Sequence, residues 1–149
     1  MSSTTHRSAG DRVEDLAADR LDAEVVPDHE AYWFDLETAS GEPVDVKGCR
    51  RRIKDGHRYG EQQYRAGRFW IPREYHERLV ENDGYYALIV YEEQSGDIEV
   101  VRFALLPAAF LEPYIGEWST TGDRTRHSAD EAAKIRHTSV FPGLEEGDS

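Results

Sequence analysis

The motif Asp45-x-Lys47, ten residues after Asp35, constrains the folding of this 149-residue chain more than any other feature. Apolar and charged residues alternate over residues 31–37 and 43–49, which is typical of half-buried strands. In an antiparallel hairpin of these strands, Asp35 is directly opposite Asp45, with Cβ atoms about 5 Å apart. Lys47, two residues further on, shares their face. The pattern therefore predicts two carboxylates and an ammonium at one place on a sheet.

Two like charges at this separation repel each other unless a cation or ligand compensates them. Mg²⁺ is commonly held by one or two carboxylates together with water and substrate phosphate, and Mn²⁺ is a candidate substitute. Such a metal lowers the pKa of a bound water, while Lys47 could orient that water or neutralise the transition state. The alternative is a solvated strand face with an Asp-Lys pair, since D-x-K alone is a weak pattern.

A helix, an acid on a strand, a tight hairpin and (D/E)-x-K on the next strand resemble the layout of the PD-(D/E)xK nuclease superfamily. This superfamily includes type II restriction enzymes and archaeal Holliday-junction resolvases, and the resemblance spans residues 9–92. It implies that Asp35 and Asp45 bind the metal and that Lys47 assists the nucleophilic water. A literal Pro-Asp dipeptide leaves Asp28 as an alternative first ligand. We favour Asp35 because it lies inside the strand pattern.

The resemblance also implies two assisting residues. Resolvase-like members place a glutamate of the first helix near the metal, and Glu14 matches it as a third metal ligand. Glu14 borders the apolar stripe of an amphipathic helix over residues 9–24, so a plain boundary glutamate is the equal alternative. Some members carry a glutamine after the lysine strand, and Gln63 is the residue that matches it best.

Basic residues concentrate downstream of the motif. Residues 47–73 contain nine basic and two acidic residues, although the whole chain has a net charge of −12. Such a segment on an acidic protein is typical of a polyanion-binding face, because Arg and Lys make most phosphate contacts. Some of these arginines could instead pair with acids elsewhere. We call the following residues the basic strip and predict that they bind nucleic acid: Arg50, Arg51, Arg52, Lys54, Arg58, Arg65 and Arg68.

Aromatic residues are interleaved with the basic strip. His57, Tyr59, Tyr64, Phe69 and Trp70 could all stack on unpaired bases. For Phe69 and Trp70 we expect instead that they enter the core on the next strand.

The remaining pattern predicts an α/β protein with a restriction-endonuclease-like αβββαβ core, a mixed central sheet and a C-terminal strand/helix extension. A third strand over 67–71, a helix that begins near Pro72 and stops at residues 82–84, and a buried strand over 85–92 complete that core. His76 on this helix could contact substrate, although a surface or capping position is the expectation for a lone helical histidine. Residues 98–107 are expected to pair with the last of these strands.

The extension is predicted to hold a helix from 108 that Pro113 interrupts, and a last strand over 135–141. Residues 9–141 are expected to form a single nuclease-like domain, with 1–8 and the acidic tail 142–149 disordered.

Composition limits the environment of the protein. The single cysteine, Cys49, excludes an internal disulfide and a cysteine-based zinc site, and we expect a buried, inert thiol. No apolar run reaches the roughly 20 residues of a membrane span, and no signal peptide is recognisable, so a cytoplasmic protein without a membrane partner is expected. Thirty acidic residues against three lysines resemble the composition of halophilic, haloarchaeal proteins.

These observations favour a Mg²⁺-dependent endonuclease that hydrolyses DNA phosphodiester bonds. Two alternatives are a non-catalytic nucleic-acid-binding relative of the same fold and an interaction protein whose basic strip docks an acidic partner. Intact Asp45 and Lys47 favour catalysis, because a binding-only domain has no need of paired carboxylates that repel phosphate. The sequence leaves open the choice between DNA and RNA, the shape of the substrate, and whether the chain forms a homodimer.

Overall fold

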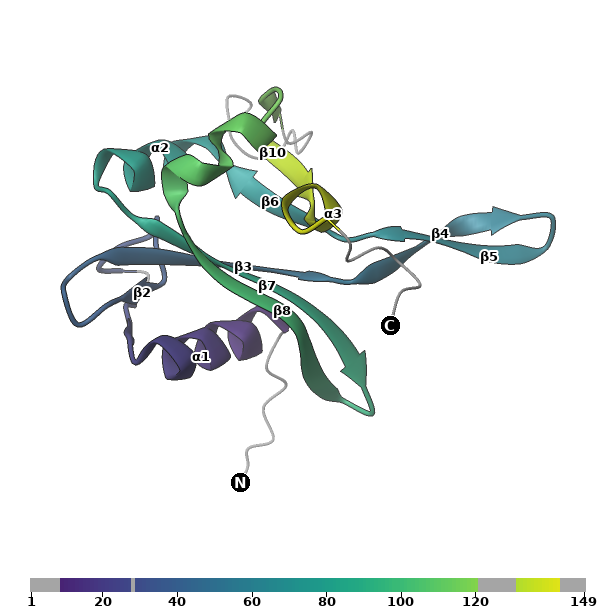
Figure 1. Cartoon of the computed structure of the whole chain (residues 1–149), viewed down its shortest axis with the longest axis horizontal. Helices are drawn as coiled ribbons and strands as arrows, with labels where there is room; N and C mark the ends of the chain where they lie inside the picture. The colour runs from purple at the N-terminus through teal and green to yellow at the C-terminus, as the bar shows by residue number, and fades with distance from the viewer. Residues whose placement is uncertain (1–8, 28, 121–130, 143–149) are drawn as a thin grey trace.

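The computed structural model describes residues 9–27, 29–120 and 131–142 (Figure 1). The following elements succeed one another along the chain: α1 (Ala9–Leu21), β1 (Glu24–Val25), β2 (Leu36–Glu37), β3 (Pro43–Arg50), β4 (Arg52–Arg58), β5 (Glu61–Ala66), β6 (Arg68–Pro72), α2 (Arg73–Glu81), β7 (Tyr85–Gln94), β8 (Asp97–Pro107), the 3₁₀ helix η1 (Ala108–Tyr114), β9 (Ser119–Thr120), β10 (Glu131–Arg136) and α3 (His137–Val140). No helix within these ranges is long and apolar enough to cross a membrane.

The central sheet has the strand order β1-β2-β3-β7-β8 and is mixed. β3 runs parallel to β7, whereas the other neighbouring pairs are antiparallel. Six consecutive residues of β7, Tyr86 to Tyr91, are buried. A strand buried on both faces has a nearly continuous apolar sequence, which explains the run YALIVY. The predicted α/β class and mixed central sheet are confirmed.

The β2–β3 hairpin has the predicted register, because Leu36 is opposite Val44 and Asp35 is therefore opposite Asp45. The prediction of a strand over all of 31–37 is wrong, since β2 contains only two residues. The backbone carbonyl of Asp35 accepts the amide of Val26, and the amide of Val46 donates instead to the Asp35 side chain at 2.8 Å. The backbone ladder between the two strands therefore ends at this aspartate.

Two layers cover the central sheet. Val13 and Ala17 of α1 pack on one face, against Val44, Ala87 and Ile89. The opposite face carries Cys49, Tyr86 and Leu88 and packs against Phe69 of β6 and Ile135 of β10. Because side chains alternate along a strand, Asp45 and Lys47 point to this second face, away from α1.

The basic segment after β3 forms a two-stranded ribbon, β4–β5, which the sequence pattern did not predict. The ribbon extends from the body of the molecule, as Figure 1 shows. Tyr59 and Gly60 form its turn with φ angles of 55° and 80°. Positive φ at both central residues is the signature of a type I′ turn, whose twist matches that of the flanking strands. The ribbon is thus a hairpin with a two-residue turn and an irregularity in its register between Lys54 and His57, and it is mostly exposed to solvent.

The ribbon ends where the chain passes close to itself. A Cβ atom at Gly67 would lie 2.0 Å from the carbonyl oxygen of Arg50, so only glycine fits there. After Gly67 the predicted third strand appears as β6. It pairs with β10 in a second sheet of order β6-β10-β9 and does not join the central sheet.

Helix α2 ends as predicted, since the amide of Gly84 donates to the carbonyl of Leu79 at 2.7 Å and Asp83 has a φ of 54°. The predicted pairing of residues 98–107 with β7 is confirmed in β8.

Two predictions for the C-terminal extension are wrong. The η1 helix continues through Pro113 to Tyr114, because the 3₁₀ turn accommodates the proline. The predicted last strand over 135–141 is instead the end of β10 followed by α3. Tertiary packing decides this change, because the Nε2 atom of the buried His137 donates a hydrogen bond to the backbone carbonyl of Arg51 at 2.7 Å. The predicted disordered ends are 1–8 and 142–149, and all of these residues except 142 lie outside the described residues.

Candidate active site

Asp45 is the most unusual charged residue of the core. It lies on β3 between β2 and β7, and only 4 % of its surface is exposed. The ammonium of Lys47 is 3.3 Å from Asp45 Oδ2. Burial raises the pKa of Asp45 well above its usual range, the Lys47 ammonium lowers that pKa, and the Asp35 carboxylate raises it further. The three predicted residues therefore come together in the structure.

Asp35 is fixed by the backbone beside it. Its Oδ2 accepts the amide of Val46 at 2.8 Å, in the position where a strand carbonyl would ordinarily accept. A carboxylate held by a main-chain donor keeps its orientation without a side-chain partner. The Asp35 carboxylate is thereby oriented beside Asp45, whose pKa it raises.

The donor set fits a hard divalent cation. Asp45 Oδ2 is buried and has no hydrogen-bond partner, because Lys47 approaches it closely but outside hydrogen-bond geometry. A buried carboxylate beside a second carboxylate is costly even with one ammonium nearby, and a cation that accepts oxygen ligands lowers that cost. Across residues 9–27, 29–120 and 131–142, no three His, Cys, Asp or Glu side chains form a metal-binding group. Asp35 and Asp45 would therefore need water and phosphate to complete a metal shell.

A second polar group, which sequence reasoning missed, borders this site. Tyr86 is the β7 partner of Asp45, and its hydroxyl is 2.8 Å from His76 Nδ1. His76 Nε2 in turn contacts a carboxylate oxygen of Glu112. Burial and the charges of Asp45 and Glu112 raise the pKa of Tyr86, so its hydroxyl stays protonated. The imidazole also stacks on the Tyr86 ring.

The prediction that His76 lies at the surface is wrong, since its exposure is 1 %. The sequence could have indicated this burial, because His76 is three residues before the buried Leu79 and residues three apart share a helix face. No sequence pattern indicated the role of the Tyr86 hydroxyl, since the apolar run around this residue predicts only a core position.

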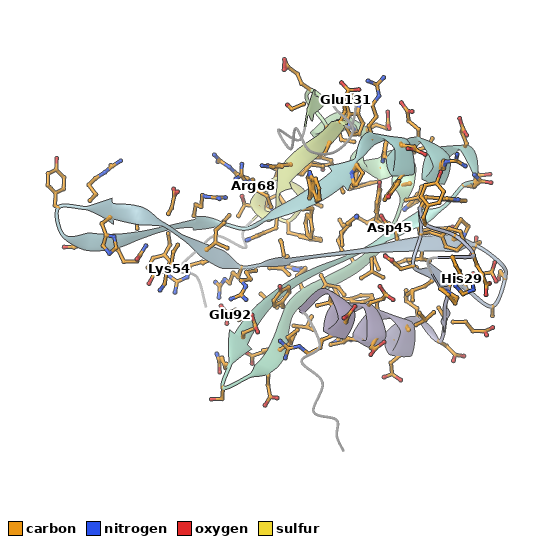
Figure 2. All side chains as sticks on the ribbon, turned by 180° about the vertical axis from the view of Figure 1, so that it is seen from behind. His29, Asp45, Lys54, Arg68, Glu92 and Glu131 are labelled. Atoms are coloured by element: carbon orange, nitrogen blue, oxygen red, sulfur yellow. The ribbon has the colours of Figure 1, made fainter. Side chains whose placement is uncertain are left out.

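The two assisting residues are not brought to the carboxylate pair. Glu14 is half-buried on α1, which packs against the face of β3 opposite to the Asp45 side chain. Gln63 lies on β5 of the ribbon, where its side chain donates to the carbonyl of Glu61 at 3.3 Å. Figure 2 shows Lys54, from the same ribbon, well apart from Asp45. The roles of Glu14 and Gln63 stay predictions, and Asp28 lies outside the described residues.

The basic strip divides into three parts. Arg50 and Arg51, at the end of β3, pair with Glu93 and Glu92 of β7. Arg68 lies on β6, in the second sheet. The ribbon carries the other four residues: Arg52, Lys54, Arg58 and Arg65.

On the ribbon, Arg65 contacts Asp55 at 3.5 Å, and the Arg52 guanidinium lies over the Tyr64 ring at 4.8 Å. Lys54 and Arg58 are exposed and have no ion-pair partner among the described residues. These two side chains are therefore open to an external anion.

Three further side chains test the predictions on burial. Phe69 enters the core as predicted, whereas Trp70 does not and is 50 % exposed. Alternation explains the difference, because neighbouring residues of β6 point to opposite faces. Cys49 is buried, and burial raises its pKa to about 12, as expected for an inert thiol.

Residues 1–142 match the model of a family described as the PD-(D/E)XK nuclease superfamily domain, and the chain belongs to this superfamily. No curated protein sequence matches the chain. The resemblance inferred from the Asp35, Asp45 and Lys47 pattern is thereby confirmed. Membership supports a nuclease-type function with nucleic acid as the substrate.

Proposed function

We propose that this protein is a Mg²⁺-dependent endonuclease that hydrolyses DNA phosphodiester bonds at Asp35, Asp45 and Lys47. The observation that carries the proposal is the carboxylate pair of the buried Asp45 and the half-buried Asp35, in which one Asp45 oxygen has no hydrogen-bond partner and Lys47 is 3.3 Å away. A purely structural pair of acids gains nothing from this arrangement, since burial and mutual repulsion both disfavour their charges.

In the proposed site, Asp35 and Asp45 hold the cation, and Mn²⁺ would substitute for Mg²⁺. A bound divalent metal lowers the pKa of its water and stabilises charge on a scissile phosphate. Lys47 directs its ammonium to the reacting phosphate or water, where a preorganised cation stabilises developing negative charge. His76 and Glu112 hold the Tyr86 ring beside Asp45, which keeps bulk water from that side of the carboxylate.

The β4–β5 ribbon supports DNA as the substrate. The major groove of B-form DNA is wide enough to admit a two-stranded ribbon, whereas the major groove of an RNA helix is too narrow for side chains to read. Lys54 and Arg58 offer unpaired cations on this ribbon. Contacts to phosphates contribute most of the affinity that does not depend on sequence.

The net negative charge of the protein affects the salt concentration at which it can bind DNA. With a net charge of −12, the protein repels DNA at long range, but the Debye length is only about 3 Å at 1 M salt. We propose a halophilic enzyme on this ground, and a cytoplasmic one because its single cysteine is a free thiol, which suits a reducing compartment. Close contacts by the ribbon then determine affinity. A homodimer would supply the second site that cleavage of both strands requires.

A cleavage panel tests the proposal. Linear duplex, single-stranded, closed circular and four-way-junction DNA, together with a matched RNA, would be incubated with Mg²⁺, Mn²⁺ or EDTA at low and molar salt. We expect metal-dependent cutting of closed circles, which have no ends for an exonuclease. The control Asp97→Asn, at an exposed acid of β8, should cut like wild type, while Asp45→Asn should not cut.

Two other results would replace the proposal. DNA binding without cleavage under every metal condition would indicate the non-catalytic relative. Absence of both binding and cleavage would indicate an interaction protein that docks through its basic strip. Size-exclusion chromatography in the same buffers would decide the oligomeric state.

A further inference from the structure

The outer face of the second sheet carries an exposed aromatic ring among cations. On β6, Phe69 and Ile71 point into the core, so Arg68 and Trp70 point outward. The register of β10 places Lys134 opposite Trp70 and Arg136 opposite Arg68. Directly opposed residues share a face, so all four side chains lie together on one surface.

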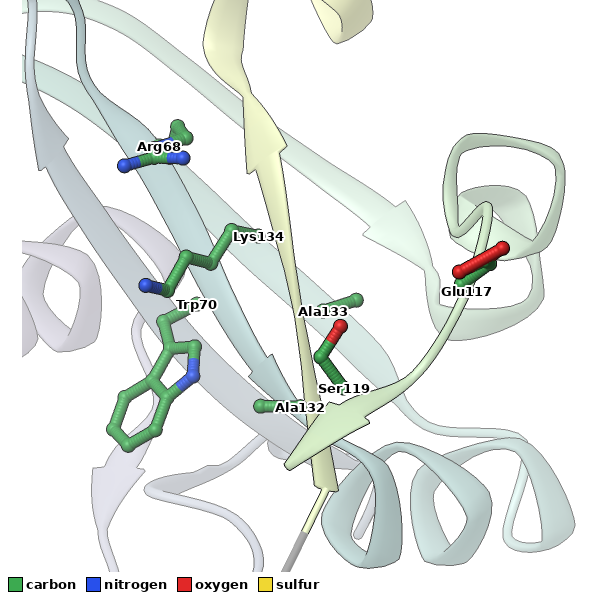
Figure 3. Close-up of a pocket in the computed structure, with 7 residues that line it drawn as sticks. All are labelled: Arg68, Trp70, Glu117, Ser119, Ala132, Ala133 and Lys134. Atoms are coloured by element: carbon green, nitrogen blue, oxygen red, sulfur yellow. The ribbon is translucent and has the colours of Figure 1, made fainter. Parts of the chain in front are cut away.

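A cavity of about 550 Å³ opens on this surface, and its volume is that of a small-ligand site. Figure 3 shows Arg68, Trp70 and Lys134 on one side of it, with Glu117 on the other. The cavity is distinct from the carboxylate pair, because the inward side chains of β6 and β10 separate the two.

The charges on this face are uncompensated within the described part of the chain. Arg68, Lys134 and Arg136 have no ion-pair partner among the described residues, although the chain has twelve more acidic than basic residues. Arg136 directly opposes Arg68, and like charges so placed destabilise a sheet. An anion with spaced negative charges would relieve this repulsion.

Trp70 specifies the kind of anion. Half of its surface is exposed, so an indole face is available to a flat ring. Bases stack on such aromatic side chains when they are unpaired, while neighbouring Arg and Lys follow the phosphates. Bases within a duplex present only their edges in the grooves, so a paired strand cannot use the ring.

We propose that the face formed by Arg68, Trp70, Lys134 and Arg136 binds an unpaired nucleic-acid strand, with a base stacked on Trp70 and phosphates against the three cations. Glu117 lies across the cavity, where a carboxylate accepts hydrogen bonds from the N–H groups of a base edge. The inference rests on the proposed function only in taking nucleic acid as the ligand. It adds a strand-holding surface separate from the cleavage site.

Fluorescence anisotropy with labelled oligothymidylate and with a labelled duplex, both in EDTA, tests the proposal without any cleavage. Trp70→Ala should weaken single-strand binding by roughly 5- to 150-fold, the range for loss of one base-stacking ring. Trp70→Phe should restore part of the loss, because a smaller ring still stacks. Arg136→Gln should weaken binding and reduce its salt dependence. A parallel series with oligouridylate distinguishes DNA from RNA.

Matched controls are the exposed aromatic Phe110 and the exposed Arg20, which lie outside this face. Phe110→Ala and Arg20→Gln should bind single strands like wild type. Single-strand affinity unchanged in Trp70→Ala, with the fold intact by circular dichroism, would overturn the inference and leave the proposed nuclease standing. Failure of the wild type to cleave any substrate would overturn the nuclease proposal while these binding results stand.

Discussion

β3 and the β4–β5 ribbon are consecutive in the chain, yet they place their charged residues in opposite environments. On β3, Asp45 is 4 % exposed and touches Lys47 within the core. On the ribbon, Lys54 and Arg58 are exposed to solvent and form no ion pair among the described residues, although Glu61 is the cross-strand partner of Arg58. Buried charges interact strongly because the surroundings respond weakly, whereas exposed charges are screened by water and salt. One segment is therefore suited to chemistry and the next to binding.

The two environments meet at a sharp boundary. Arg50 and Arg51 end the buried strand and pair with Glu93 and Glu92, so their charges serve the fold. Gly67 permits the return strand to pass over the Arg50 carbonyl. We therefore expect substitutions before this crossing to change chemistry or stability, and substitutions beyond it to change affinity.

The largest expected effect comes from the two lysines on either side of this boundary. Lys47→Ala should lower the single-turnover cleavage rate by about 10²- to 10⁴-fold with DNA affinity nearly intact, because the ammonium acts mainly on the transition state. Lys54→Ala should weaken affinity modestly and leave the rate at saturating DNA unchanged. Rapid-quench cleavage together with anisotropy measures both quantities. Equal losses of rate and affinity in Lys47→Ala would make Lys47 one more phosphate contact.

The reactivity of cysteine thiols compares the solvent accessibility of β3 with that of the β4–β5 ribbon. Burial raises the pKa of Cys49 to about 12, so at pH 9 it should react with iodoacetamide about 500-fold more slowly than an ordinary thiol. A cysteine introduced on the ribbon as Lys54→Cys, in a Cys49→Ala background, should react at the rate of an unfolded chain. Comparable rates at the two positions would show that β3 opens readily to solvent.

The buried aspartate should also make folding depend on pH. Because the pKa of Asp45 is raised in the folded protein, the unfolded chain releases this proton first, and stability falls as pH rises from the ordinary aspartate range through the raised value. In EDTA, this adds up to about 1.4 kcal/mol of lost unfolding free energy per pH unit for one group. Urea denaturation from pH 4 to pH 8 measures the slope.

Asp45→Asn should remove that extra slope, whereas the exposed control Asp97→Asn should keep it. Mg²⁺ or Mn²⁺ should raise the stability of the wild type at pH 8, and calorimetry should detect weak binding that Asp45→Asn abolishes. Wild-type binding retained in Asp45→Asn would remove Asp45 from the metal site. Binding unchanged in Asp35→Asn would return attention to Asp28.

The smallest expected effect concerns the ribbon alone. Neutralising Lys54 and Arg58 together should reduce the slope of log affinity against log salt by about 1.8, because each duplex phosphate contact contributes roughly 0.9. The free energy of unfolding should change by less than about 0.5 kcal/mol, as for exposed residues elsewhere. A salt slope equal to that of the wild type, measured by anisotropy over a range of KCl, would place the ribbon outside the DNA interface.

Local pattern accounts for the parts of the fold and site that could be predicted. Alternation and hairpin length predicted that Asp35 opposes Asp45 and that Lys47 shares their face. Helix α2, the buried strand β7 and its partner β8 were predicted on the same ground. In these segments the signal comes from neighbours in sequence, since periodicity and turn residues act over a few positions.

Other features depend on contacts between distant segments. The polar sequence 52–66 has no alternation of apolar and polar residues. Alternation predicts only strands with one buried face, so it could not predict this β-ribbon. Trp70 and Phe69 are adjacent, and only the position of the core beneath β6 decides which of them is exposed.

The sequence by itself determined the chemistry that this chain has available: two acids and a lysine on one face of a hairpin, because side-chain alternation in strands is a local property. The tertiary structure decided which of these groups are buried and what surrounds them. It buried Asp45 beside Tyr86, whose hydroxyl contacts His76. It also placed α1 with Glu14 on the other face of the sheet, and separated the ribbon and the Trp70 surface from the core. These outcomes depend on how layers pack over long sequence separations, and no short stretch of residues encodes that packing.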